Sequence, residues 1–129
     1  MNRKNFLSFA AIVALGVGSV ASLFPAALLT SKGVLPTAST CLWMREVGVI
    51  LIALGVVAGM VRTHPDSPTL RALMAGNLLI QLGLLGVEVA GYAAGVITLL
   101  SGILPNAILH VVLAMGFAWF AFSPRSSSR

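Results

Sequence analysis

Residues 6–29 read FLSFAAIVALGVGSVASLFPAALL and contain no charged side chain. A helix of this length is about 36 Å long, whereas the hydrocarbon core of a bilayer is about 30 Å thick. The run therefore predicts a membrane-spanning helix. Three further apolar runs, at residues 42–61, 72–92 and 103–122, are also long enough to cross a bilayer.

Turn-forming residues separate the four runs. They are Gly33, Pro36, Pro65, Asp66, Pro68, Gly95 and Gly102. Helices joined by short connections pack as antiparallel neighbours. We therefore expect an all-α polytopic membrane protein, in which a single domain over residues 1–129 forms an up-down bundle of four transmembrane helices.

The composition excludes several other classes. Of the 129 residues, 58% are hydrophobic and only 9% are charged, with a mean hydropathy of +1.02. Soluble domains carry roughly a quarter charged residues, so this chain is not expected to be a soluble globule, a disordered chain or a disulfide scaffold. The four spans nearly exhaust its length, which leaves no room for a separate soluble catalytic domain.

The positions of Lys and Arg predict the orientation. Six of the eight lie on one side of the predicted bundle, namely Arg3, Lys4, Arg62, Arg71, Arg125 and Arg129. Lys32 and Arg45 lie on the other side. Because cytoplasmic segments carry the excess of basic residues, both termini are expected in the cytoplasm. The net charge of +5 then reflects topology, and no nucleic-acid partner is expected, since the basic residues do not share one surface.

The first run also resembles a secretory signal, with a basic start and small residues at Ser19 and Ala21. The apolar run continues for eight residues beyond Ala21, which favours an uncleaved first helix. Amino-terminal sequencing that begins at Ser22 would overturn this interpretation.

Several chemistries lack the residues they require. A thiol oxidoreductase needs a Cys-x-x-Cys pair, whereas Cys41 is the single cysteine. His64 in a connection and His110 in a span do not form a bis-histidine haem site. No glycine-rich phosphate loop, zinc motif or nucleophile elbow is present, and no metal site is expected.

Polar residues inside the third and fourth spans fall on narrow stripes. Asn77, Gln81 and Glu88 lie at 0°, 40° and 20° around the helix at about 100° per residue. Asn106 and His110 are four residues apart and share one face of the fourth span. An ionisable group inside a span costs about 2.5–3.5 kcal/mol, so these stripes should face other helices or a cavity.

Arg45 and Glu46 lie one turn inside the second span. With the predicted topology, Arg45, Glu46, Glu88 and Asn106 lie roughly 9–10 Å outside the midplane, and His110 about 3 Å outside it. We therefore expect a polar pocket in the outer half of the bundle. Its net charge is −1 unless His110 or a carboxylate takes up a proton, and Glu88 with His110 are the candidate proton-exchanging or catalytic pair.

Structural roles compete with this interpretation. Asn77, Gln81 and Asn106 also suit interhelical hydrogen bonding, and Arg45 with Glu46 are near enough to the interface to reach water. Small-residue pairs such as Gly55 with Gly59, Gly18 with Ser22 and Gly91 with Gly95 predict close helix packing within the bundle, or a homodimer. The apolar connection at residues 96–100 is expected to extend the third helix or to cover the polar pocket.

Three motifs resemble the DoxX-like family of small four-helix membrane proteins. They are Trp43-Met44-Arg45-Glu46-Val47-Gly48, Arg71 followed by Gly76-Asn77, and Leu-His-x-x-Leu-x-x-Gly-Phe from Leu109 to Phe117. The resemblance covers residues 42–122. It implies a four-helix bundle in a bacterial cytoplasmic (inner) membrane and, in some members, association with quinone-linked redox systems.

The leading hypothesis from the sequence is a membrane protein that binds a hydrophobic or amphipathic molecule, a quinone or a lipid, as an accessory subunit of a redox system. Its pocket would contain Arg45, Glu46, Glu88, Asn106 and His110, with Gln81 and Asn77 nearby. The alternatives are a small proton-coupled transporter acting as a dimer, an intramembrane acid–base enzyme, and a structural subunit of a larger membrane complex. The uncharged first span argues against the transporter, because small multidrug transporters carry a carboxylate there.

Overall fold

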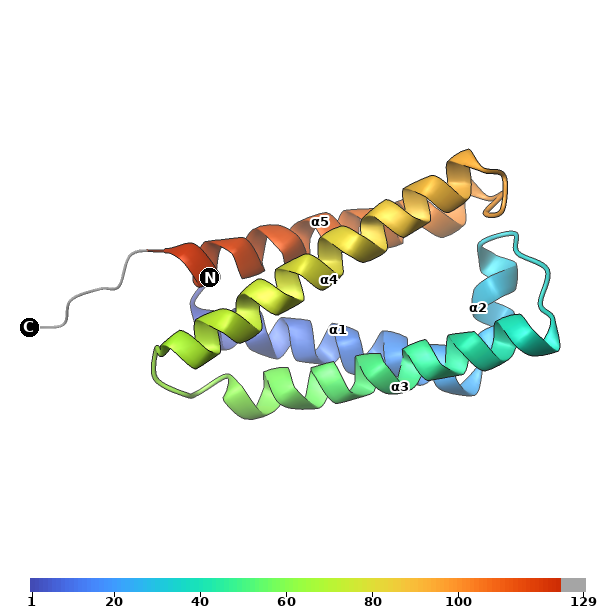
Figure 1. The fold of residues 1–129 in the computed structure, drawn as a ribbon. Coiled ribbons are helices and arrows are strands. Elements are labelled where there is room, and N and C mark those ends of the chain that lie inside the picture. The colour runs from blue at the N-terminus through green and yellow to red at the C-terminus, as the bar shows by residue number, and fades with distance from the viewer. Residues whose placement is uncertain (124–129) are drawn as a thin grey trace, which may run out of the picture.

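A computed structural model describes residues 1–123, which form five α-helices and no strand (Figure 1). The helices are α1 (Arg3–Leu23), α2 (Pro25–Ser31), α3 (Ala38–Val61), α4 (Pro68–Ala93) and α5 (Leu100–Phe122). Arg125 and Arg129, which entered the prediction of orientation, lie outside the described residues. The all-α class is confirmed.

Four of these helices, α1, α3, α4 and α5, are long and apolar enough to cross a membrane. Large apolar side chains also cover the outer faces of these helices. Ile12 is 71% exposed, Val49 63%, Leu79 72% and Met115 62%. An exterior of this kind suits lipid and not water. The predicted number of four helices able to span a membrane is confirmed.

The sequence predicts one continuous helix over the first apolar run, but the structure divides this run into two helices. It divides at Phe24, where φ is −127° and ψ is 49°, and α2 begins at Pro25. Proline has no amide hydrogen and its ring conflicts with the preceding helical turn, so it starts helices better than it continues them. As a result α2 turns away from the axis of α1 (Figure 1).

Side-chain caps explain why α3 and α4 begin about one turn before the predicted spans. Thr37 caps α3 with a reciprocal capping box that includes Thr40. Ser67 caps α4 by accepting a hydrogen bond from the amide of Leu70, and Pro68 occupies the first turn. These polar caps satisfy amide groups that the helix itself leaves unpaired.

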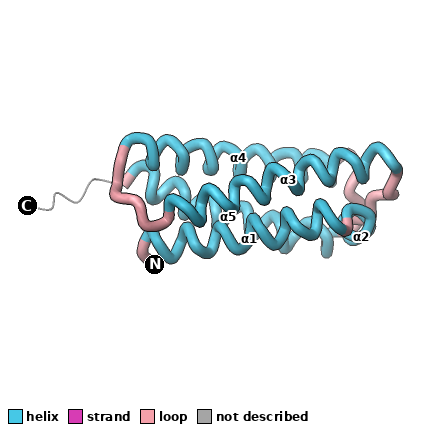
Figure 2. The backbone as a smooth tube through the Cα atoms, turned by 90° about the horizontal axis from the view of Figure 1, so that it is seen from below, coloured by secondary structure: helices cyan, strands magenta, loops and turns pink. Residues whose placement is uncertain are grey.

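The helices pack as two pairs, α1 with α3 and α4 with α5 (Figure 1), and the contacts between the pairs are fewer. Figure 2 shows the same bundle from below. Glycine allows α1 and α3 to approach closely. A Cβ atom on Gly18 would lie 2.8 Å from the carbonyl oxygen of Gly48, and one on Gly55 would lie 3.0 Å from the amide nitrogen of Leu15. The predicted use of small residues for packing within the bundle is confirmed for Gly18 and Gly55.

An apolar core joins the two pairs at the end of the bundle that holds the N-terminus, the α3–α4 connection and the end of α5 (Figure 1). Phe6 from α1 is 1% exposed, and its ring packs edge-on against Phe117 of α5 at 4.9 Å between centroids. Leu70 and Met74 of α4 are also buried there. We call this the core end.

At the opposite end, which we call the α2 end, backbone hydrogen bonds join the two connections. The amides of Thr98 and Leu99 donate to the carbonyl oxygen of Lys32 at 3.2 and 3.3 Å. The Thr98 hydroxyl donates to the carbonyl of Gly33, which has a φ of 71° that favours glycine. The apolar connection after α4 therefore lies against the α2–α3 turn and does not extend α4.

Candidate functional site

A cavity of about 260 Å³ lies between the two helix pairs, on the side of the core end that faces the α2 end. Ala10, Ala58, Leu113 and Phe117 belong both to the apolar core and to the cavity wall, so they form its floor. Between this floor and the α2 end, the wall of the cavity is mostly aliphatic. The polar side chains that line it are those of Lys32, Asn77, Gln81, Glu88, Asn106 and His110. Their concentration in one otherwise apolar cavity makes it the candidate site.

Five of these side chains form a continuous hydrogen-bonded chain, Lys32–Glu88–Asn106–His110–Gln81, which we call the polar chain. Lys32 Nζ pairs with Glu88 Oε1. Asn106 Nδ2 donates to the same oxygen at 2.6 Å and lies 3.2 Å from His110 Nε2. His110 Nδ1 lies 2.7 Å from Gln81 Oε1.

The partners in the polar chain define one consistent arrangement of hydrogens. The amide of Asn106 has two hydrogens, one for Glu88 Oε1 and one for His110 Nε2. The Nε2 atom of His110 then accepts, and its Nδ1 atom carries the hydrogen that is donated to Gln81. Because Asn106 lies between Glu88 and His110, these two titratable groups are linked through an amide and not by a direct bond.

Burial makes these hydrogen bonds important. His110 and Gln81 are each 8% exposed, and they are the buried polar residues of the described chain. The second carboxylate oxygen of Glu88, Oε2, is buried and has no hydrogen-bond partner among the described residues. A buried acceptor without a donor is costly, so Glu88 has capacity for one further hydrogen bond.

Lys32 is a cavity residue that the sequence pattern did not predict, because its position between two apolar runs indicates only a charge that sets topology. It ends α2 as the C-cap residue, and its side chain reaches Glu88 of α4. The predicted net charge of −1 is therefore replaced by a balanced pair. The residue in the sequence that could have indicated this contact is Pro25. A helix break at Pro25 turns α2 and places Lys32 across the end of the bundle.

The structure brings five of the seven predicted site residues to the cavity: Asn77, Gln81, Glu88, Asn106 and His110. Arg45 and Glu46 do not line it, and both are exposed on α3. The α3 residues that line the cavity include Met44, Val47 and Leu51. Arg45 and Glu46 lie roughly 120–140° around the helix from that face, so they share its depth but not its direction.

Asn77 lines the cavity outside the polar chain. Its side-chain amide donates to the carbonyl of Leu73, one turn earlier on α4, at 2.9 Å. This bond within one helix replaces the interhelical contact that the sequence allowed. Asn77 therefore adds a polar point to the wall without joining the helix pairs.

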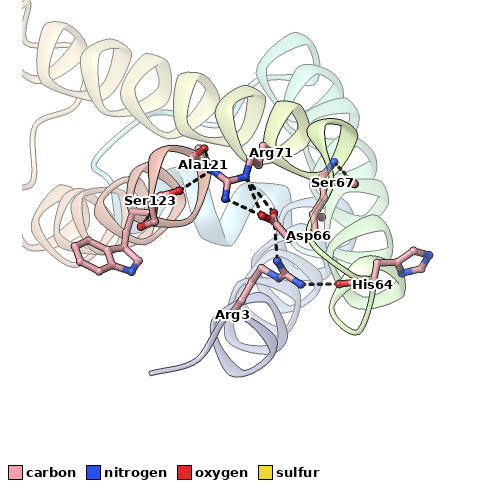
Figure 3. A network of polar contacts seen from close by, with 9 residues as sticks. Arg3, His64, Asp66, Ser67, Arg71, Ala121 and Ser123 are labelled. Carbon is pink, nitrogen blue, oxygen red and sulfur yellow. Dashed lines mark hydrogen bonds and ion pairs between the residues drawn. The ribbon is translucent and has the colours of Figure 1, made fainter. Parts of the chain in front are cut away.

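A second polar network closes the core end (Figure 3). Asp66, in the α3–α4 connection, forms ion pairs with the guanidinium of Arg71 at 2.7 Å and with that of Arg3 at 3.5 Å. Arg71 also donates to the carbonyl of Ser123 at 2.6 Å, and Arg3 to that of His64 at 2.6 Å. This network ties α1, α4 and the end of α5 together and does not reach the cavity lining.

The chemistry available in the described residues is therefore hydrogen bonding and proton exchange. Among residues 1–123, no three His, Cys, Asp or Glu side chains gather in a way that would hold a metal ion. Comparison of the chain with protein-family models, curated proteins and solved structures gives no match. The resemblance to DoxX-like proteins stays a prediction, and function has to be argued from the cavity itself.

Proposed function

We propose that the protein is a membrane-embedded binding protein for an uncharged amphipathic molecule, a quinone or an uncharged lipid, whose head group occupies the cavity. The observation that carries this proposal is the polar chain along one part of an otherwise aliphatic cavity. Binding sites for small molecules combine apolar walls with a few placed polar groups in this way.

The size of the cavity favours a head group over a whole lipid. Its volume of about 260 Å³ is slightly below the roughly 300–1,000 Å³ of typical ligand pockets. A single ring or a glycerol head fits such a space. The aliphatic side chains around it, including Val13, Leu54 and Leu84, favour an apolar ring or the first part of a hydrocarbon tail.

The charge balance favours an uncharged head. Lys32 and Glu88 already neutralise each other, and a charged ligand would bring an uncompensated ion into a site of low dielectric, at a cost of several kcal/mol. The ammonium of Lys32 has three donors, so it can also donate to a ligand carbonyl. Glu88 Oε2 supplies an acceptor for a ligand hydroxyl.

A redox context is part of the proposal. Quinone carbonyls accept hydrogen bonds, and the hydroxyls of the reduced form donate them. The polar chain offers donors at Lys32 and an acceptor at Glu88. The resemblance to DoxX-like proteins implies a bacterial inner membrane and, in some members, an association with quinone-linked systems. We propose an accessory role in such a system, with membrane lipids or the subunits of a larger membrane complex as partners.

Co-purification tests the proposal. We expect solvent extracts of the purified protein to contain a quinone or uncharged lipid near one equivalent, measured by mass spectrometry. Ala14→Phe, which fills the cavity wall, should abolish it. Ala53→Phe, on an exposed position of α3, should retain it. Equal content in both variants, or none in the wild-type protein, would contradict the proposal.

A proton-coupled transporter is the second candidate, favoured by one observation: the polar chain links two titratable groups, Glu88 and His110, through Asn106. In proteoliposomes this function requires substrate flux that follows a pH gradient and is abolished by Glu88→Gln. An absence of such flux with organic cations, in vesicles whose protein still binds quinone or lipid, would remove this candidate.

A further inference from the structure

A second hollow lies on the outside of the bundle, between α1 and α5 near the α2 end. This groove has a volume of about 470 Å³. Gly16 and Val20 of α1 form one side, and Gly102 and Pro105 of α5 form the other. No atom lies within 4 Å of the point where a Cβ of Gly16 would stand. The groove is open at this point because Gly16 has no side chain and no side chain of α5 fills the space.

The groove and the cavity share six lining residues: Val13, Val17, Leu28, Lys32, Asn106 and Leu109. Four of them are aliphatic, and two, Lys32 and Asn106, belong to the polar chain. The same side chains thus face the cavity on one side and the exterior on the other. The two hollows therefore meet at a shared wall, and this wall includes Lys32 and Asn106 of the polar chain.

The direction of the groove matches that of a lipid molecule. Its polar residues lie at the α2 end, and its α1 wall continues along Val20, Val17 and Val13 to Ile12. Eight residues of helix span about 12 Å. In the predicted orientation, a head group at Lys32 lies near the outer surface and a tail along α1 points to the middle of the bilayer.

We infer that the groove between α1 and α5 is a lateral portal, through which the ligand enters from the bilayer and in which its hydrocarbon tail stays while the head group contacts Asn106 and Lys32. This inference rests on the proposed function and adds the route by which the ligand enters. It also specifies the chemical structure of the ligand, which has an uncharged head group with oxygen acceptors and a hydrocarbon tail. Quinones and monoacylglycerols share this chemistry, and the experiment separates them.

The test uses Gly16→Leu, which fills the groove. The new side chain has open space, and leucine favours a helix over glycine, so this variant should fold at least as stably as the wild type. The matched control is Gly83→Leu on α4, which also has no atom within 4 Å of the new Cβ and lies outside the groove.

Binding is measured in lipid nanodiscs with three probes: decylubiquinone, monodecanoylglycerol and the tailless ring of ubiquinone. We expect Gly16→Leu to weaken whichever tailed probe binds by about tenfold or more, and to leave the affinity for the tailless ring within twofold if that ring binds. Gly83→Leu should match the wild type. The tailed probe that binds identifies the source of the ligand.

Two outcomes contradict different claims. If Gly16→Leu binds the tailed probe as tightly as Gly83→Leu does, the portal is wrong and the cavity proposal stands. If the wild-type protein binds neither tailed probe, the proposed function is wrong, and the portal with it. Equal weakening of the tailed probe and of a bound tailless ring would place the effect in the head-group site, which also contradicts the portal.

Discussion

Lys32 and Glu88 pair across the α2 end of the bundle, although 56 positions separate them in the chain. The two side chains are only 14% and 12% exposed. Their pairing balances the charge of the cavity and anchors α2 to α4. It also explains how a carboxylate is tolerated inside an apolar helix, since a buried ion is stabilised mainly by its partner.

Removal of one partner should cost more stability than removal of both. Glu88→Gln leaves the Lys32 ammonium without its counter-charge and is expected to destabilise the protein by about 3 kcal/mol. The double variant Lys32→Gln with Glu88→Gln should recover part of this loss. Thermal unfolding in detergent measures both. The control is Glu46→Gln, which changes an exposed carboxylate on α3 and should have little effect.

If Glu88→Gln and Glu46→Gln unfold at the same temperature, the ion pair does not contribute to stability. If the double variant is less stable than either single variant, the two residues stabilise the protein independently and not as a pair.

The tautomer of His110 is a second prediction. Its Nδ1 atom lies 2.7 Å from the side-chain oxygen Oε1 of Gln81, and its Nε2 atom faces the side-chain amide of Asn106. Nitrogen-15 NMR of labelled protein at neutral pH should therefore show a protonated Nδ1 and an unprotonated Nε2. The opposite assignment, or signals typical of imidazolium, would contradict the hydrogen-bonding order of the polar chain.

Glycine packing between α1 and α3 gives a third prediction. A Cβ on Gly48 would lie 2.7 Å from the carbonyl oxygen of Gly18 and 2.7 Å from the amide of Ser22. Gly48→Ala should therefore force the helices apart and cost about 1–3 kcal/mol. Gly83→Ala, at an open position of α4, should be neutral or stabilising by up to about 1 kcal/mol. Similar unfolding temperatures for the two variants would contradict the close approach.

Cysteine labelling tests the orientation. Cys41 lies in the first turn of α3 at the α2 end, which the basic residues predict to be outside the cell. A membrane-impermeant maleimide should label it in intact cells. Thr63→Cys in a Cys41→Ser background, located in the α3–α4 connection, should react only after permeabilisation. The reverse pattern would invert the predicted topology.

Helical periodicity predicted most of the polar residues that line the cavity. Residues of α4 and α5 that share a face, such as Gln81 with Glu88 and Asn106 with His110, reach one cavity because the spacing of 3.6 residues fixes their direction. The same rule, applied to α3, would have placed Arg45 and Glu46 away from Met44 and its neighbours. A similar depth in the membrane does not specify a common direction around the helix axis.

The role of Lys32 depended on a feature that hydropathy does not register. Pro25 is counted as one more uncharged residue in an apolar run, yet it ends α1 and starts α2. Only the resulting turn brings the residue after α2 over Glu88. Contacts made by a chain reversal of this kind depend on tertiary geometry, which local pattern does not contain.

The central claim is that a head group occupies the cavity, and photolabelling locates it most directly. A benzoquinone that carries a diazirine on its ring is irradiated with the protein in nanodiscs, and the modified residues are identified by mass spectrometry. We predict modification at cavity residues such as Met44 and Leu84, suppressed by excess decylubiquinone. Modification confined to outward residues such as Met60 and Leu79, or unaffected by the competitor, would contradict the claim.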